Sequence, residues 1–80
     1  MAMIDTWARL ASENPGHIVF VKIGDFFETF DEHALTVADV LKVYTQKRAG
    51  RTMAGFPYHS YWRYEQRLKD MGYPVITLGE

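Results

Sequence analysis

The 80-residue sequence has room for one small domain, which on folding buries roughly 60% of the surface of its unfolded chain. Almost half of the residues are hydrophobic, which excludes an intrinsically disordered chain. Nine basic residues against ten acidic ones exclude binding that depends on net charge alone, and the absence of cysteine excludes disulfides and thiolate metal sites.

Hydrophobic spacing and turn residues predict the element order α-β-β-α-β-β-α-β. Apolar residues three and four positions apart indicate the helices, and short apolar runs between Gly, Pro and Asn indicate the strands. In chain order, the expected elements are a helix that stops at Asn14-Pro15-Gly16, strands at His17–Ile23 and Phe26–Phe30, a helix capped by Asp31 with an apolar stripe ending at Leu41, strands at Val43–Lys47 and Thr52–Phe56, a helix capped by Ser60 with an apolar face ending at Met71, and a strand at Tyr73–Leu78. This order predicts an α/β fold with a single mixed β-sheet flanked by about three helices.

Glycines and prolines mark the expected connections. Gly24-Asp25 predicts a two-residue hairpin turn, Ala49-Gly50 a second turn, and Gly72 takes the C′ position after the last helix. Pro74 is tolerable only near the start of its strand or on a sheet edge. No repeat or linker divides the chain, so we expect one domain over residues 1–80.

The sequence has no feature that predicts membrane contact. Its longest purely apolar run, Ile18–Val21, is far too short to span a bilayer. No basic-then-apolar secretion signal is found, and the absence of cysteine suits a reducing compartment. We therefore expect a cytoplasmic protein.

The stretch Gly24–Phe30 (GDFFETF) has a residue pattern that is unusual for a strand with only a structural role. Side chains alternate along a strand, so Phe26, Glu28 and Phe30 share one face. Burying a carboxylate between two phenylalanines is costly, which favours an outward-facing start of the strand. An exposed phenylalanine ring can insert between two base steps, and this insertion costs less free energy at a mispaired step. A carboxylate can accept a hydrogen bond from a base N–H or a protonated ring nitrogen. The residues alone leave open a core strand with one solvated charge.

A second unusual stretch is Met53–His59 (MAGFPYH). Gly55 permits a tight backbone and Pro57 fixes φ. The histidines of the chain lie in separate segments without the spacing of metal ligands, so we expect no metal and no cofactor.

Both stretches are similar to motifs of one family. Gly24–Phe30 resembles G-D-F-(Y/F)-E-x-F and Met53–His59 resembles M-A-G-(I/V/F)-P-Y-H, two motifs of the N-terminal, mismatch-reading domain of the MutS DNA mismatch repair proteins. Thr45–Arg48 is similar to the family's L-T-K-R segment, and Leu68–Ile76 follows its order of helix, glycine and apolar strand. The Arg48–Met53 loop is shorter than longer family versions, which carry additional DNA contacts.

The resemblance implies a DNA-binding module that recognises mispaired or distorted duplex. By motif match, Phe26 stacks on the mispaired base from the minor groove and Glu28 hydrogen-bonds it, while Phe27 faces the core. The implied partner is double-stranded DNA with mispairs or small bulges. A basic stretch that includes Lys47, Arg48 and Arg51 is expected to contact DNA; the alternative is a solvated surface. Binding by the domain alone is expected to be weak, so other repair proteins or self-association are expected to contribute.

Two alternatives remain at this point. A protein-interaction or competitor protein could keep the fold while binding DNA weakly or not at all, which the balanced charge favours. A small nuclease needs clustered carboxylates, but Asp25, Glu28, Asp31 and Glu32 are scattered by strand alternation and a cap position. There is no catalytic serine, cysteine or histidine pattern and no G-x-x-x-x-G-K-(S/T) loop, so we expect neither an ATPase nor another enzyme, and no catalytic residues.

Overall fold

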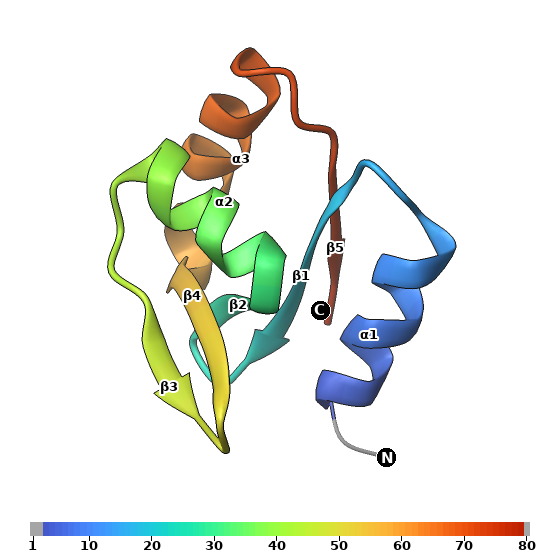
Figure 1. The fold of residues 1–80 in the computed structure, drawn as a ribbon. Helices are drawn as coiled ribbons and strands as arrows, with labels where there is room; N and C mark the ends of the chain where they lie inside the picture. The colour runs from blue at the N-terminus through green and yellow to red at the C-terminus, as the bar shows by residue number, and fades with distance from the viewer. Residues whose placement is uncertain (1–2, 80) are drawn as a thin grey trace.

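The structure, a computed structural model, describes residues 3–79 as one mixed sheet with helices on both faces (Figure 1). The elements in chain order are α1 (Met3–Glu13), β1 (Ile18–Ile23), β2 (Phe26–Phe30), α2 (Asp31–Leu41), β3 (Gln46–Arg48), β4 (Arg51–Pro57), the 3₁₀-helix η1 (Tyr58–Ser60), α3 (Tyr61–Asp70) and β5 (Val75–Leu78). The predicted α/β class and the predicted element order are confirmed.

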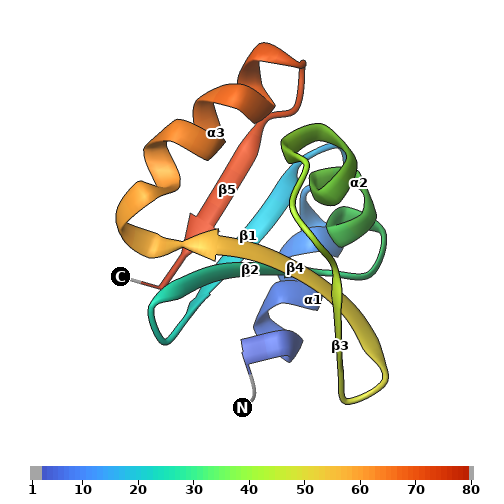
Figure 2. The ribbon, with the colours of Figure 1, turned by 90° about the vertical axis from the view of Figure 1, so that its left-hand side faces the viewer.

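The sheet contains five strands in the order β3-β4-β2-β1-β5. β1 and β2 are antiparallel, β4 pairs antiparallel with both β2 and β3, and β5 runs parallel to β1 at one edge. β2 therefore lies in the middle of the sheet, between β1 and β4. Figure 2 shows the β3–β4 hairpin extending away from α3.

Two helices cover one face of the sheet. The buried residues of this core come from α2, α3 and three strands: Ile18, Phe20, Phe27, Ala34, Val37, Leu41, Ala54, Phe56 and Leu68. Phe56 packs against Phe20 and stacks on Tyr64 of α3 with ring centroids 4.6 Å apart. Phe27 faces this core, as the family resemblance implies.

The single helix α1 covers part of the other face, opposite α2 and α3 (Figure 1). Its buried Trp7 packs edge-on against Phe30 at 5.5 Å between ring centroids. The Trp7 indole N–H donates hydrogen bonds to the Val19 carbonyl oxygen at 2.8 Å and to the Thr29 Oγ1 at 3.1 Å. These contacts hold α1 over β1 and the end of β2, because a buried indole N–H needs an acceptor.

The predicted connections are largely confirmed. Ile23 pairs with Phe26, so the intervening Gly24, at φ 60°, and Asp25 form a two-residue hairpin turn. Gly72 ends α3 in a Schellman motif, in which its N–H donates to Lys69 and the Tyr73 N–H donates to Leu68, both at 2.9 Å.

The predicted Asp31 cap is wrong, and the predicted Ser60 cap is confirmed in position only. Asp31 is the first residue of α2 instead of its cap; Phe30 takes the cap position, and the Asp31 carboxylate pairs with Arg51 of β4. Ser60 occupies the cap position of α3, but its side chain makes no capping hydrogen bond, since η1 leads directly into the helix.

Several predicted ranges also differ from the observed elements. The third strand is Gln46–Arg48 instead of Val43–Lys47, because Val43 packs on the α2–α3 core and only the exposed residues after it pair with β4. The last strand begins at Val75, since the Tyr73 N–H already bonds to the helix. Met71 is exposed and does not belong to the apolar face of α3. No helix within residues 3–79 is long and apolar enough to cross a membrane.

Candidate nucleic-acid interface

The helix α1 leaves part of its sheet face uncovered. We call this part, around Phe26 and Glu28 of β2, Gly55 of β4 and Gln46 of β3, the open face. Strand alternation places Phe26, Glu28 and Phe30 on the same side of β2, but α1 covers only Phe30. The Phe26 side chain, beyond the reach of α1, is 45% exposed. The start of the strand therefore projects outward, as its sequence predicted.

The Glu28 side chain is buried on this face, and Gly55 makes room for it. Glu28 pairs with Gly55 across β2 and β4. A Cβ at position 55 would lie 2.8 Å from the Glu28 Cδ, and closer still to a carboxylate oxygen and to the Phe27 carbonyl oxygen. The carboxylate thus lies over a position that has no side chain. Glu28 is only 9% exposed, but its carboxylate keeps some contact with solvent, because no fully buried side-chain oxygen within residues 3–79 lacks a hydrogen-bond partner.

The Glu28 carboxylate is electrostatically unusual. Within residues 3–79, it has no hydrogen-bond or ion-pair partner. Burial raises the pKa of this carboxyl above its ordinary value, and the positive charge of Arg48 lowers it in part. An unpaired acid on the floor of an open surface is costly for stability, and it is available to a ligand.

Phe26 stands between two hollows. One hollow of about 210 Å³, which we call the Glu28 hollow, is lined by Phe26, Glu28, Tyr44, Gln46, Met53, Ala54 and Gly55. The other, of about 360 Å³, is lined by Asp25, Phe26, Pro57, Tyr58 and His59. Phe26 borders both, so its ring forms a ridge on the open face.

The two motifs identified in the sequence therefore meet in space. β4 carries most of the second motif and pairs along its length with β2, which carries the first. The family model described as "MutS domain I" matches residues 1–79. The chain belongs to the MutS domain I family.

Curated relatives agree with this assignment. Each is a "DNA mismatch repair protein MutS": that of Petrotoga mobilis is 41% identical over 73 residues, and that of Fervidobacterium nodosum is 43% identical over 73 residues. The matched segments cover 91% of this chain in both comparisons. The relative from Chlorobium chlorochromatii is 36% identical over 76 residues, or 94% of this chain. The chain spans about 9% of the length of these relatives.

The three predicted basic contacts of this MutS domain I lie in different environments. Arg48 is on the open-face side of β3 and acts electrostatically on Glu28. Arg51 pairs with Asp31, and this hydrogen-bonded pair lowers the pKa of the Asp31 carboxyl. Lys47 points to the opposite side of the sheet, where its ammonium donates to the Thr52 Oγ1 at 2.9 Å. Of the three, Arg48 and Arg51 lie on the side of the sheet that carries Phe26 and Glu28, and Arg51 is paired with Asp31.

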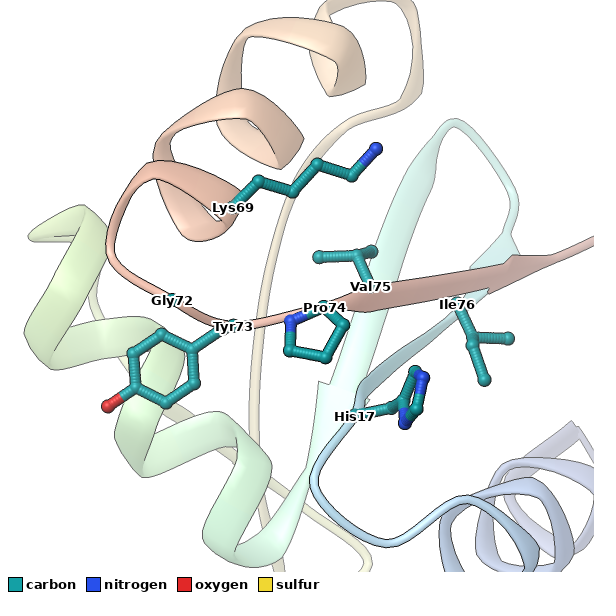
Figure 3. A pocket seen from close by; sticks show the side chains of 7 residues that line it. All are labelled: His17, Lys69, Gly72, Tyr73, Pro74, Val75 and Ile76. Carbon is teal, nitrogen blue, oxygen red and sulfur yellow. The ribbon is translucent and has the colours of Figure 1, made fainter.

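A larger hollow lies elsewhere on the domain. It has a volume of about 490 Å³ and is lined by His17, Lys69, Gly72, Tyr73, Pro74, Val75 and Ile76. Figure 3 shows it where the chain passes from α3 into β5, beside the start of β1. None of the predicted site residues lines it. Within residues 3–79, no three His, Asp or Glu side chains are grouped as metal ligands.

Sequence reasoning missed two residues beside the predicted pair. Tyr44 and Gln46 both line the Glu28 hollow, and Tyr44 is 93% exposed. The sequence pattern predicts a strand at Tyr44, but this residue precedes β3. An aromatic residue next to a run of exposed polar residues was the available signal, but its partners come from strands distant in the sequence.

Proposed function

We propose that this domain binds double-stranded DNA at mispaired or distorted steps and reads them with Phe26 and Glu28. The supporting observation is the juxtaposition on the open face of an exposed aromatic side chain and a largely buried carboxyl group that has no hydrogen-bond partner within residues 3–79. The names of its relatives, DNA mismatch repair proteins, support the same substrate. Mispairs and small bulges are the proposed targets.

Phe26 acts as the wedge. Its ring is exposed between two hollows, so a duplex can approach it without displacing core residues. Inserting such a ring from the minor groove unstacks one base step and kinks the duplex, at a cost of a few kcal/mol. A mispaired step is already poorly stacked, so the cost there is smaller. Discrimination thus arises from the deformability of the DNA instead of from its sequence.

Glu28 supplies the polar contact. Its carboxylate accepts a hydrogen bond from a base N–H or a protonated ring nitrogen. When it is protonated, which its raised pKa favours, it donates to a ring nitrogen. Because Gly55 has no side chain, the Glu28 carboxyl group lies close to the backbone of β4. Only a base that lies directly against the open face can therefore make this contact.

Phosphate contacts are proposed for Lys47, Arg48 and Arg51. Arg51 forms an ion pair with Asp31, and the net charge of the chain is −1. The electrostatic attraction between the domain and the DNA phosphates is therefore small. We expect dissociation constants of roughly 10⁻⁴–10⁻⁶ M at physiological salt for undamaged duplex. Other repair proteins or self-association would supply further affinity. The sequence contains no nucleotide-binding P-loop, and the proposed role needs no catalytic residue, cofactor or ATP hydrolysis.

Fluorescence anisotropy at low salt tests this function. A matched duplex is compared with the same duplex carrying a G·T pair or a one-base bulge, for the wild type, Phe26→Ala and Glu28→Ala. Trp62→Ala is the matched control, because Trp62 is also an exposed aromatic residue but lies on α3, which covers the opposite sheet face. We expect the wild type and the control to prefer the damaged duplex, and Phe26→Ala to lose this preference.

Equal binding to all duplexes by the wild type would contradict the proposal. The balanced charge of the chain would then support the second candidate, a protein-interaction module that keeps the fold without reading DNA.

A further inference from the structure

We infer that His33 is the proton-sensitive part of a latch that joins α1 to α2. The latch consists of the His33 imidazole, the Trp7 indole and the backbone of Val19, which both rings contact by hydrogen bonds. It is independent of the proposed function, because none of its three residues lines the hollows beside Phe26.

Val19 uses this latch because β2 does not pair with it. The pairing of β1 with β2 ends at Val21 and Glu28. The Ile18 N–H donates to the Pro74 carbonyl oxygen on the β5 side at 2.9 Å, so the N–H and carbonyl groups of the next residue, Val19, point to the β2 side. Val19 is fully buried, and buried backbone groups need hydrogen-bond partners.

Two aromatic side chains take the place of the missing strand. The Val19 N–H donates to the His33 Nδ1 at 3.2 Å, and the Val19 carbonyl oxygen accepts from the Trp7 indole N–H at 2.8 Å. The two rings contact each other edge to face, with centroids 5.1 Å apart. The chain turns from β2 into α2 at Asp31, whose φ is 54°, and this turn brings His33 back to β1. One residue of β1 is therefore held by a side chain from each helix.

Protonation of His33 breaks one half of the latch. Because Nδ1 accepts a hydrogen bond, the ring is neutral and carries its proton on Nε2. A proton added to Nδ1 makes this atom a donor that faces the Val19 N–H, and the hydrogen bond between them is lost. Trp7 holds α1 to the same residue of β1. Loss of the bond therefore loosens the docking of α1, the helix that covers Phe30.

The surroundings of His33 favour the neutral ring at pH 7. Burial lowers the pKa of His33 below its ordinary value of 6.5, and the carboxylates of Glu32 and Asp31 raise it in part. β4 contributes Arg51, which is paired with Asp31, and α1 contributes Asp5, whose charge acts on Arg51. The folded protein therefore binds this proton less tightly than the unfolded chain does. The loss of stability begins as the pH falls below 6.5 and is complete below the folded-state pKa.

Two-dimensional ¹H–¹⁵N NMR of the wild type between pH 7.5 and pH 5 tests the latch directly. We expect the signals of the Val19 amide and the Trp7 indole N–H to shift together, with a common midpoint below 6.5. His33→Asn keeps an acceptor oxygen near the position of Nδ1 but does not titrate, so it should abolish both shifts. His59→Asn is the matched control, because it removes an exposed histidine, and it should keep both shifts.

Thermal unfolding measures how much the latch contributes to stability. Between pH 7.5 and pH 5, the Tm of the wild type should fall by roughly 4–8 °C more than that of His33→Asn, as expected for the loss of one hydrogen bond in a domain of this size. Other titrating groups are common to both proteins, so the difference reports on His33. His33→Phe keeps a ring but offers no acceptor, so it should be less stable than the wild type at pH 7.5 and show no such additional fall.

Two results would overturn the latch. A wild-type Val19 amide signal that does not move between pH 7.5 and pH 5 would show that protonation of His33 does not reach this backbone group. An equal fall in Tm for the wild type and His33→Asn would show that other groups cause the acid sensitivity. Neither result bears on the reading of mispairs, which anisotropy measures separately.

Discussion

Glu28 is the residue at which stability and the proposed function conflict. The carboxyl group is buried against Gly55 without a hydrogen-bond partner within residues 3–79. Natural proteins retain such groups mainly at sites where a ligand completes the missing interactions. The cost of the arrangement should be measurable in the free protein.

Replacing Glu28 by Gln is expected to increase the free energy of unfolding at pH 7. Burial raises the folded-state pKa of this carboxyl above its ordinary value of 4.5, so the folded state holds the proton more tightly than the unfolded state does. The destabilisation caused by the charge is complete above the folded pKa and disappears as the pH falls below the unfolded value. Urea unfolding of both proteins at pH 7 and at pH 4 measures this. The advantage of Glu28→Gln should shrink at pH 4; equal stabilities at pH 7 would contradict the burial cost.

Gly55 is expected to tolerate no side chain. Gly55→Ala would place a Cβ against the Glu28 carboxylate and the Phe27 carbonyl oxygen. Overpacking of this kind typically costs about 1–3 kcal/mol, and each kcal/mol lowers the Tm of a domain of this size by roughly 4–8 °C. Thermal unfolding followed by circular dichroism measures the loss. The double variant Gly55→Ala, Glu28→Ala should recover part of it, because only the backbone collision remains. An unchanged Tm for Gly55→Ala would show that Glu28 does not lie over this position.

Among the elements, the position of α1 decides which residues of β2 are available. The indole of Trp7 anchors the helix to Val19 and Thr29, so Phe30 is covered and Phe26 is not. The same strand therefore contributes to the core at one end and to the open face at the other. A helix docked toward the start of β2 would bury the wedge.

The turn of the β3–β4 hairpin contains a non-glycine residue with positive φ. Ala49 and Gly50 both have positive φ, 52° and 79°, as in type I′ turns. Alanine is strained there and asparagine is much less so, so Ala49→Asn is expected to stabilise the domain by up to about 1 kcal/mol. Urea unfolding provides the measurement. Ala49→Val serves as the opposite control and should destabilise, because a β-branched residue rarely adopts positive φ. A loss of stability in Ala49→Asn would contradict the turn geometry.

At the scale of the whole molecule, charge limits the binding of DNA. The chain has a net charge of −1, Arg51 is paired with Asp31, and Lys47 lies on the other side of the sheet from Arg48. Few positive groups are therefore available to phosphates at one time. Affinity for undamaged duplex should be low, and discrimination should depend on the groups of the open face.

The salt dependence of binding tests this limit. With two or three phosphate contacts, the logarithm of the binding constant should fall against the logarithm of salt concentration with a slope of about −2 to −3. Arg48→Ala should reduce the slope by about one and weaken binding to matched and mispaired duplexes alike. Anisotropy titrations at several salt concentrations give both values. A slope steeper than about −5 would mean that more basic residues meet the DNA than this proposal allows.

The elements and their order could be predicted from the sequence, because they depend on local chemistry. Helical spacing, strand alternation and the glycine turns act over a few residues, so Gly24-Asp25 and Gly72 could be placed correctly. The same rule placed Phe26 and Phe27 on opposite faces of their strand, and the family motif assigned Phe27 to the core. The two long motifs also identify the family, because each is a contiguous run of residues that can be compared directly.

Which of these residues are exposed, buried or paired depends on tertiary contacts. Phe26, Glu28 and Phe30 share one face of β2 but differ in exposure, because α1 and Gly55 approach them from elsewhere in the chain. Asp31 pairs with Arg51 instead of capping its helix for the same reason. Tyr44 lines the Glu28 hollow together with residues of β2 and β4, most of which are distant from it in the sequence. Alternation and spacing are local properties, whereas burial and pairing depend on contacts between segments that are distant in the chain.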